Sequence, residues 1–336
     1  MSVNRLFNDR TYASGDIDAQ LRVLQMTGAT VARSDALWEA AEPAPPAGGI
    51  HRYQWGFDDM VAGSLAAHGL QWLPILDYTA GWDQSTPGQD HSPPRSPDEF
   101  AAFAAAFARR YGAGGTFWSE GRAPQAVPVQ TYEIWNEPDN AEFWYPAPDA
   151  AAYAGLYEQA RDAITSVSPD ARVIIGGLSN PEGFLPAMLA ARPELGGHID
   201  GVAIHPYGAG PAVVLARLRG ARATLDRLGL ARVPLYVTEF GWTTSPPGSL
   251  DYAPASARPG YIESTLAAIG RSSCGVATAI LYTWVTPERN PADREDWFGI
   301  HAPGHGASAD AAAFAAGLRE ATAPGVTGAV CGAGAR

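Results

Sequence analysis

The feature that most constrains this chain is a regular alternation of short apolar runs with longer helical stretches. Strand-like runs bounded by turn residues lie at 28–34, 71–78, 127–136, 172–176, 199–205, 233–239 and 277–284, and we expect a first strand at 1–8. Helical stretches lie near 17–27, 57–69, 97–111, 149–167, 182–192, 211–229, 258–271 and 308–320. Strands that alternate with helices in this way are typical of a (β/α)8 TIM barrel.

A doubly wound open sheet is the alternative fold for such an alternation. That fold usually carries a glycine-rich phosphate-binding turn after an early strand. Neither GxGxxG nor GxxxxGK[ST] follows a strand-like run here, which favours the closed barrel. We therefore predict one barrel over residues 1–325 and a C-terminal tail over 326–336. In such barrels, catalytic residues lie at the carboxyl ends of the strands.

Composition excludes several classes of partner. The chain has 336 residues and a net charge of −12, and all 23 basic residues are arginine. Nucleic-acid binding needs a basic face, so the acidic balance argues against it. No run approaches the roughly 18 apolar residues of a membrane-spanning helix. We expect neither a nucleic-acid nor a membrane partner, and we expect a monomer.

The two cysteines, Cys274 and Cys331, leave two readings open. They form no CxxC motif and cannot make a zinc site alone. Either they form a disulfide that ties the tail to the barrel, or both are free thiols. A disulfide indicates an oxidising compartment, so we expect a secreted or extracellular protein. The first ten residues lack the apolar stretch of a signal peptide, which keeps a cytoplasmic location open.

Two strand-like runs end on a glutamate. One run closes with Trp-Asn-Glu-Pro, and Pro138 cannot continue a regular ladder, so Glu137 lies at the strand tip. The other closes with Thr-Glu-Phe-Gly, where Glu239 precedes the breaker Gly241. Counted from the strand at 1–8, these are the fourth and seventh strands, which face each other across a barrel mouth. Two facing carboxyls, one protonated and one ionised, are typical of glycoside hydrolysis.

These two motifs resemble those of glycoside hydrolase clan A, and family 39 and its family 5-like relatives look most similar. The resemblance implies that Glu137 is the acid/base and that Glu239 is the nucleophile. Asn136, beside the acid, offers an amide to a sugar hydroxyl. The implied reaction is a double displacement with retention of configuration, which needs no cofactor and no metal.

Single residues extend the resemblance. Arg33 matches the clan's second-strand arginine, whose cation would keep the nucleophile ionised. His205 and Tyr207 match its His-x-Tyr segment, in which the tyrosine hydroxyl orients the nucleophile. Trp284 matches the tryptophan that forms the floor of the sugar site next to the cleaved bond.

The substrate implied by the resemblance is a β-linked oligo- or polysaccharide. Further candidate sugar-stacking residues lie in the loops after several strands, and these are Trp82, Trp144, Trp242 and Trp297. Two rival hypotheses remain. A transglycosylase would use the same residues, whereas a catalytically silent carbohydrate-binding barrel would keep the tryptophans without needing both glutamates.

Overall fold

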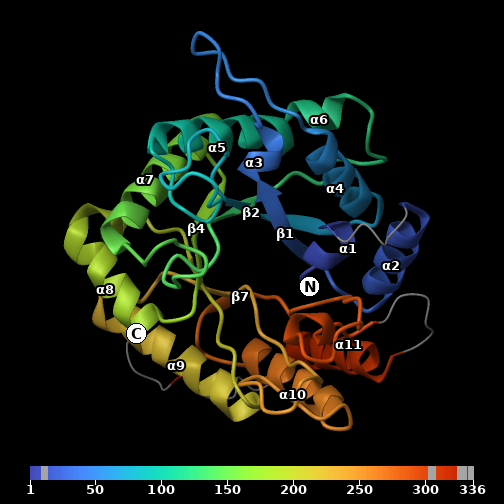
Figure 1. Ribbon diagram of the computed structural model, residues 1–336. Helices are drawn as coiled ribbons and strands as arrows, with labels where there is room; N and C mark the ends of the chain where they lie inside the picture. The colour runs from blue at the N-terminus through green and yellow to red at the C-terminus, as the bar shows by residue number, and fades with distance from the viewer. Residues whose placement is uncertain (9–13, 302–307, 324–330, 332–336) are drawn as a thin grey trace. The chain divides into compact units, whose positions relative to one another are not determined.

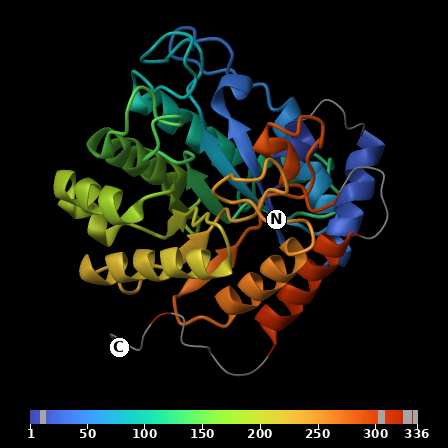
Figure 2. The same ribbon diagram turned by 60° about the horizontal axis from the view of Figure 1, so that its bottom comes forward.

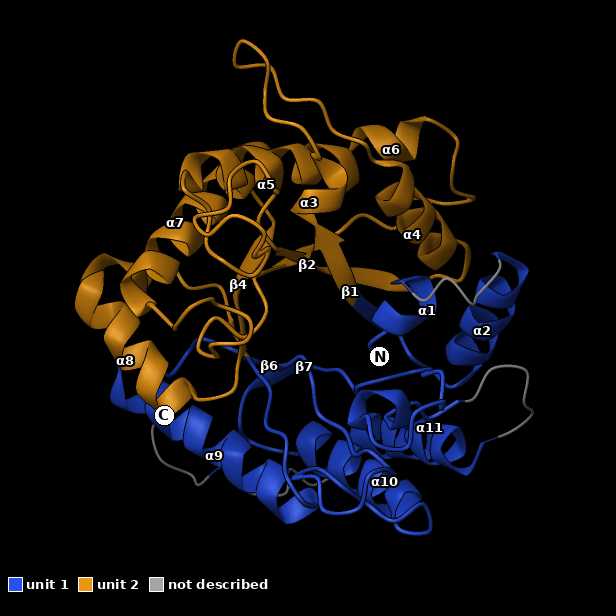
Figure 3. Cartoon of the chain, in the orientation of Figure 1, with its two compact units in different colours: residues 1–33, 204–336 blue, residues 34–203 orange. Residues whose placement is uncertain are grey.

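A computed structural model describes residues 1–8, 14–301, 308–323 and 331. The chain divides into two compact units (Figure 3). Unit 1 combines residues 1–33 with 204–336, and unit 2 is the continuous stretch 34–203. The predicted tail at 326–336 lies outside the described residues except for Cys331.

Unit 2 holds most of the parallel strands, and their spatial order follows the chain order. The strands that fall wholly or mostly in unit 2 are β1 (Val31–Leu37), β2 (Gln71–Asp77), β3 (Thr131–Ile134), β4 (Arg172–Leu178) and β5 (Val202–Ile204). In the register of β3 with β4, Ile134 pairs with Ile175. Strands β2, β3 and β4 are buried at every residue except the first, as expected for parallel strands covered by helices.

The described helices of unit 2 include four that the sequence pattern predicts, near 57–69, 97–111, 149–167 and 182–192, and three short ones that it does not. They are α3 (Trp38–Ala41), α4 (Gly56–Ala67), α5 (Pro97–Tyr111), α6 (Thr116–Ser119), α7 (Ala150–Val167), α8 (Pro181–Ala191) and the 3₁₀ helix η1 (Pro193–Gly197). Helix α5 begins with Pro97, which suits a first helical position, and ends before Gly112. Its buried face includes Phe100, Phe103 and Phe107 at helical spacing. Helix α7 packs against α5 and β4 (Figure 1).

Unit 1 carries the remaining elements. They are α1 (Asn4–Asn8), α2 (Ser14–Met26), β6 (Leu235–Val237), β7 (Val276–Ala279), α9 (Pro211–Arg227), α10 (Arg258–Gly270), η2 (Arg294–Trp297) and α11 (Ala309–Thr322). Strands β6 and β7 pair in parallel. Helices α10 and α11 lie side by side (Figure 2). The residues described contain no helix of the length and apolarity that a bilayer crossing requires.

The expected first strand at 1–8 is only partly present. Ser2 makes a single parallel bridge to Arg33, and its amide donates to the carbonyl of Leu281 at 3.0 Å. The chain then turns into α1 at Asn4. Residues 1–3 are therefore extended and hydrogen-bonded like a strand in unit 1, but the segment is too short to form one. The described residues form seven strands in a parallel α/β arrangement, and the predicted eight-stranded barrel is not confirmed.

The cysteine pair is settled in favour of a disulfide. Cys274 and Cys331 are joined by a disulfide, with their Cα atoms 5.1 Å apart and a sequence separation of 57. Cys274 lies just before β7, so the disulfide fixes a point near the C-terminus to unit 1.

Candidate active site

Glu239 stands just beyond β6, and the local backbone explains why. The Thr238 amide donates to the carbonyl of Ile204 at 3.2 Å, which extends the strand by one residue. At Gly241 the chain passes so close to its neighbour that an added Cβ would lie 2.1 Å from the carbonyl oxygen of Tyr282. Only glycine allows this approach, so the Thr-Glu-Phe-Gly motif fixes where the strand ends and where Glu239 lies.

Both oxygens of the Glu239 carboxylate have a partner in unit 1. A guanidinium nitrogen of Arg33 donates to Oε1 at 2.5 Å, and the Tyr207 hydroxyl donates to Oε2 at 2.7 Å. Arg33 is only 1 % exposed, so its charge is little screened by water. Burial and the neighbouring Glu239 raise the pKa of Tyr207 well above its usual value, which keeps this hydroxyl a proton donor.

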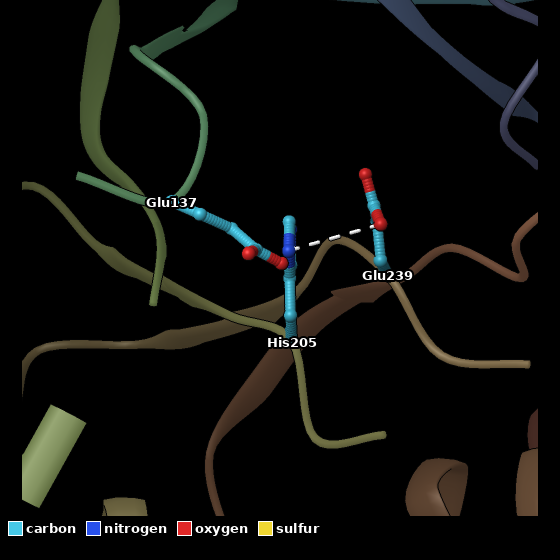
Figure 4. Close-up of side chains that lie close together, drawn as sticks. All are labelled: Glu137, His205 and Glu239. Carbon is cyan, nitrogen blue, oxygen red and sulfur yellow. Dashed lines mark ion pairs between the residues drawn. The ribbon is translucent and has the colours of Figure 1, made fainter. Parts of the chain in front are cut away.

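His205 completes the surroundings of Glu239 in unit 1 (Figure 4). Its Nδ1 lies 3.7 Å from Oε2 of Glu239, and its Nε2 lies 3.5 Å from Arg33 and 3.1 Å from the Thr238 hydroxyl. A guanidinium only donates hydrogen bonds, so Nε2 accepts there. The structure thus brings Arg33, His205 and Tyr207 together around Glu239.

Two residues beside this group escaped the sequence analysis. The Tyr282 hydroxyl donates to Glu295 at 2.8 Å, and the Tyr282 ring lies 6.4 Å from that of Tyr207. Burial raises the pKa of Glu295, and the charge of Glu239 contributes to this rise. An aromatic residue at a strand end was the available signal for Tyr282. Glu295 sits in the short helix η2 and carries no motif.

Glu137 lies in unit 2 on a segment locked by buried hydrogen bonds. The β3–β4 ladder ends at Ile134. There the Tyr153 hydroxyl replaces a backbone partner by donating to the Ile134 carbonyl at 2.7 Å. The same hydroxyl accepts the amide of Gly176 at 2.8 Å. A Cβ at Gly176 would lie 2.1 Å from the carbonyl oxygen of Trp135, so this approach also requires glycine.

The backbone around Glu137 adopts an uncommon conformation. Trp135 has a φ of 67° and Glu137 a φ of 43°, which is the left-handed region that side chains other than glycine rarely occupy. The turn is closed by Asn140, whose amide donates to the carbonyl of Glu137 at 3.0 Å and whose side chain donates to Oε2 of Glu137 at 2.8 Å. Asn136 and Glu137 are both buried.

The tryptophans proposed to stack on sugars divide into two groups. Trp82 and Trp297 are partly exposed, with indole N–H groups that donate to the carbonyls of Glu42 at 2.9 Å and Asn290 at 2.8 Å. Their rings are therefore held in place with surface left to contact a ligand. These two remain candidates for sugar stacking.

For Trp144, Trp242 and Trp284, the structure corrects the prediction. Trp284 is 0 % exposed, donates to Gln20 at 2.8 Å and stacks on His301 at 4.8 Å, so no ring face is open to a sugar. Trp144 and Trp242 are also buried. All three are packing residues here: Trp144 packs on Trp135 and Tyr153, and Trp242 packs on Phe240 and Tyr261.

Comparison with known proteins supports the fold. No family model and no curated protein matches the sequence. Among solved structures, a monomeric β-xylosidase from Caulobacter crescentus CB15 is 20 % identical with a TM-score of 0.70, covering 90 % of this chain and 65 % of its own. A family 39 enzyme from Xanthomonas axonopodis pv. citri is 19 % identical, with a TM-score of 0.69 and coverages of 89 % and 62 %. A fungal β-1,4-galactanase structure is 16 % identical with a TM-score of 0.61, and the match covers 88 % of this chain and 90 % of the galactanase.

At these identities the likeness shows a shared fold. This chain spans 61 to 68 % of the length of three family 39 structures. The resemblance to clan A glycoside hydrolases close to family 39 is confirmed at the level of the fold, an α/β fold of the TIM-barrel type.

Proposed function

We propose that this protein is a retaining glycoside hydrolase that cleaves β-linked oligo- or polysaccharides. The observation that carries the proposal is the setting of Glu239, whose two carboxylate oxygens are held separately by Arg33 and Tyr207. A carboxylate nucleophile must be ionised and aimed at the anomeric carbon. A buried cation and a partly buried hydroxyl donor meet both needs. The shared fold of the family 39 structures supports the same reading.

In the proposed reaction, Glu239 attacks the anomeric carbon and Glu137 protonates the departing oxygen. A glycosyl ester on Glu239 forms, and the bond to the leaving group breaks. Glu137 then removes a proton from water, which attacks the ester and releases the sugar and Glu239. The pairing of Glu137 with Glu239 across the site belongs to the proposal, as do the absence of a metal and the action of a monomer.

Substrate contacts in the proposal fall to residues with open surface. Trp82 and Trp297 offer ring faces, and the buried amide of Asn136 lies next to the acid in sequence. The solved structures with this fold include β-xylosidases, a β-1,4-galactanase and an endo-β-1,4-mannanase. We therefore propose a β-linked substrate for this chain.

The test is a screen of aryl β-glycosides and β-linked polysaccharides with the wild type, Glu137→Ala and Glu239→Ala. We expect the wild type to cleave at least one substrate, with a first product of retained anomeric configuration by NMR. Both variants should lose about 10³-fold or more in kcat. The exposed Glu320→Ala, which removes a surface partner of Arg271, is the matched control.

Azide separates the two roles. With Glu239→Gly, azide should replace the missing nucleophile and give an α-glycosyl azide, whereas with Glu137→Ala it should give a β-glycosyl azide. A wild type inactive on every β-linked substrate would contradict the proposed function. A first product of inverted configuration would contradict retention.

A further inference from the structure

The segment that carries Glu137 is anchored by a side chain that the proposed reaction does not use. Asp139 lies two residues beyond Glu137, and its carboxylate accepts the backbone amides of Ser179 at 3.2 Å and Asn180 at 2.5 Å. Asn180 is the residue that precedes α8, and Ser179 follows β4. Asp139 therefore ties the turn at 137–140 to the junction between β4 and α8.

This position suits an ionised carboxylate. The two amides that it accepts belong to the residues directly before α8, and the helix dipole favours a negative charge at this end of the helix. Burial raises the pKa of the Asp139 carboxyl, the two amides oppose this rise, and the charge of Glu137 adds to it. Asp139 in turn helps to raise the pKa of the buried Tyr153, and Glu182 lies in the first turn of the helix that Asp139 adjoins.

Asn140 links the anchor to Glu137. It follows Asp139 directly, and it contacts Glu137 through both its amide and its side chain, at 3.0 and 2.8 Å. Its own carbonyl accepts the amides of Phe143 and Trp144 at 3.0 and 2.9 Å. A left-handed backbone at Glu137 costs free energy and persists only where the surroundings hold it. The contacts of Asp139 and Asn140 contribute to holding this turn in place.

We propose that Asp139 is a positioning residue for Glu137: by fixing the turn at 137–140 to the start of α8, it sets the place and direction of the Glu137 carboxyl. This inference rests on the proposed function, because it assigns Glu137 the role of acid/base. It adds a residue that no sequence motif indicated. A misplaced Glu137 slows protonation of the leaving group and activation of water, but not the attack of Glu239 on a glycoside whose leaving group needs no proton. This difference gives the inference a specific signature.

The experiment compares two β-glycosides of the same sugar that differ in leaving group. A dinitrophenyl glycoside departs without protonation, whereas an unactivated oligosaccharide needs the acid. For Asp139→Ala we expect kcat/KM on the oligosaccharide to fall about 100-fold, while formation of the glycosyl-enzyme from the dinitrophenyl glycoside changes by less than about threefold. The readout is pre-steady-state release of the phenol. Asp139→Asn, which keeps shape and one acceptor, should lie between wild type and Asp139→Ala.

Asp149→Ala is the matched control. Asp149 caps α7 through two backbone amides at 3.0 and 2.9 Å, so its loss also removes two such hydrogen bonds in unit 2 without touching the turn. It should leave the ratio between the two substrates unchanged. Thermal melting of each variant reports whether it folds, and Asp139→Asn carries the test if Asp139→Ala does not.

The outcomes separate the inference from the proposed function. Equal losses on both substrates, or no loss on the oligosaccharide, would overturn the positioning role of Asp139. Glu137→Ala must show the same dependence on leaving group more strongly. If Glu137→Ala cleaves the oligosaccharide as fast as the wild type, the assignment of the acid/base fails, and the inference fails with it.

Discussion

At the scale of single residues, the carboxylates of the two glutamates have specific hydrogen-bond donors. Arg33 and Tyr207 donate to the two oxygens of Glu239, and Asn140 donates to one oxygen of Glu137. A carboxylate that loses a hydrogen bond in such surroundings keeps its desolvation cost but not its compensation. Each of these hydrogen bonds should therefore contribute more free energy than a hydrogen bond at an exposed position.

We predict that Tyr207→Phe lowers kcat by about 10- to 100-fold, because a hydrogen bond to a charged group contributes about 1.5–3 kcal/mol. Thermal stability should change little, since the ring remains. Steady-state kinetics on the best substrate of the screen, with a melting curve, gives the measurement. Tyr261→Phe, in a ring packed on Trp242 at 5.4 Å, is the control and should keep full activity. An unchanged kcat in Tyr207→Phe would show that this hydroxyl does not assist Glu239.

The first turn of helix α4 supplies a second residue-scale prediction. Asp58 is 4 % exposed, and its Oδ1 has no hydrogen-bond partner among the described residues. Burial, with a contribution from Asp59, raises the pKa of Asp58 to about 8. Folding thus favours the neutral acid. Its contribution to stability is fully present below the unfolded pKa of about 4 and is lost as the pH rises through 8.

We expect Asp58→Asn, which is neutral at every pH, to be more stable than the wild type at pH 8 by about 1–3 kcal/mol. The difference should fade toward pH 4. Urea unfolding at several pH values measures it, with the exposed Asp98→Asn in the first turn of α5 as control. A difference that does not vary with pH would contradict the raised pKa.

At the scale of elements, close backbone approaches decide where strands end. A Cβ at Gly241 would lie 2.1 Å from the Tyr282 carbonyl oxygen, an atom of the backbone that cannot rotate away. We predict that Gly241→Ala lowers the free energy of unfolding by about 2–4 kcal/mol and also reduces kcat, because Glu239 and Tyr282 must shift apart.

The matched variant is Gly260→Ala in α10, where nothing lies within 4 Å of the added Cβ. This variant should be stabilised by about 0.5–1 kcal/mol, as expected for alanine inside a helix. Chemical unfolding of both variants gives the comparison. Equal effects at the two positions would show that the approach at Gly241 is not restrictive.

The elements themselves were largely predictable. The helix expected at 97–111 is found at Pro97–Tyr111, and the strand expected at 71–78 is Gln71–Asp77. Apolar spacing, proline at helix starts and glycine after helix ends are local signals. The strand predicted at 1–8 is the element that differs most from the structure, because a run of three extended residues leaves no periodic pattern to detect.

At the scale of the whole molecule, the disulfide between Cys274 and Cys331 closes a loop of 57 residues. A crosslink of this length restricts the unfolded chain by about 4 kcal/mol in the loop-entropy estimate. We predict that the double variant Cys274→Ser, Cys331→Ser has a lower melting temperature than the wild type, by up to about 10 °C. Calorimetry with and without reductant measures it. A reductant that lowers Tm in the double variant as well would point to another cause.

The disulfide also bears on where the protein works. We propose that the chain matures in an oxidising compartment and acts outside the cytosol, because such bonds persist there. A thiol count on denatured, unreduced protein from its source organism should give no free thiol. Two free thiols would contradict this location.

The sequence by itself determined the order of the main strands and helices and the two glutamates that follow strands, because these depend on residues close together in the chain. Only the tertiary structure decided the partners. Arg33 forms an ion pair with Glu239, which lies 206 positions later in the sequence. Trp284 is buried, whereas Tyr282, two residues earlier, packs against Tyr207 beside Glu239. Local periodicity says which face of an element is apolar. Whether a large side chain on that face fills the core or borders a site depends on what packs against it from elsewhere in the chain, and no local pattern carries that information.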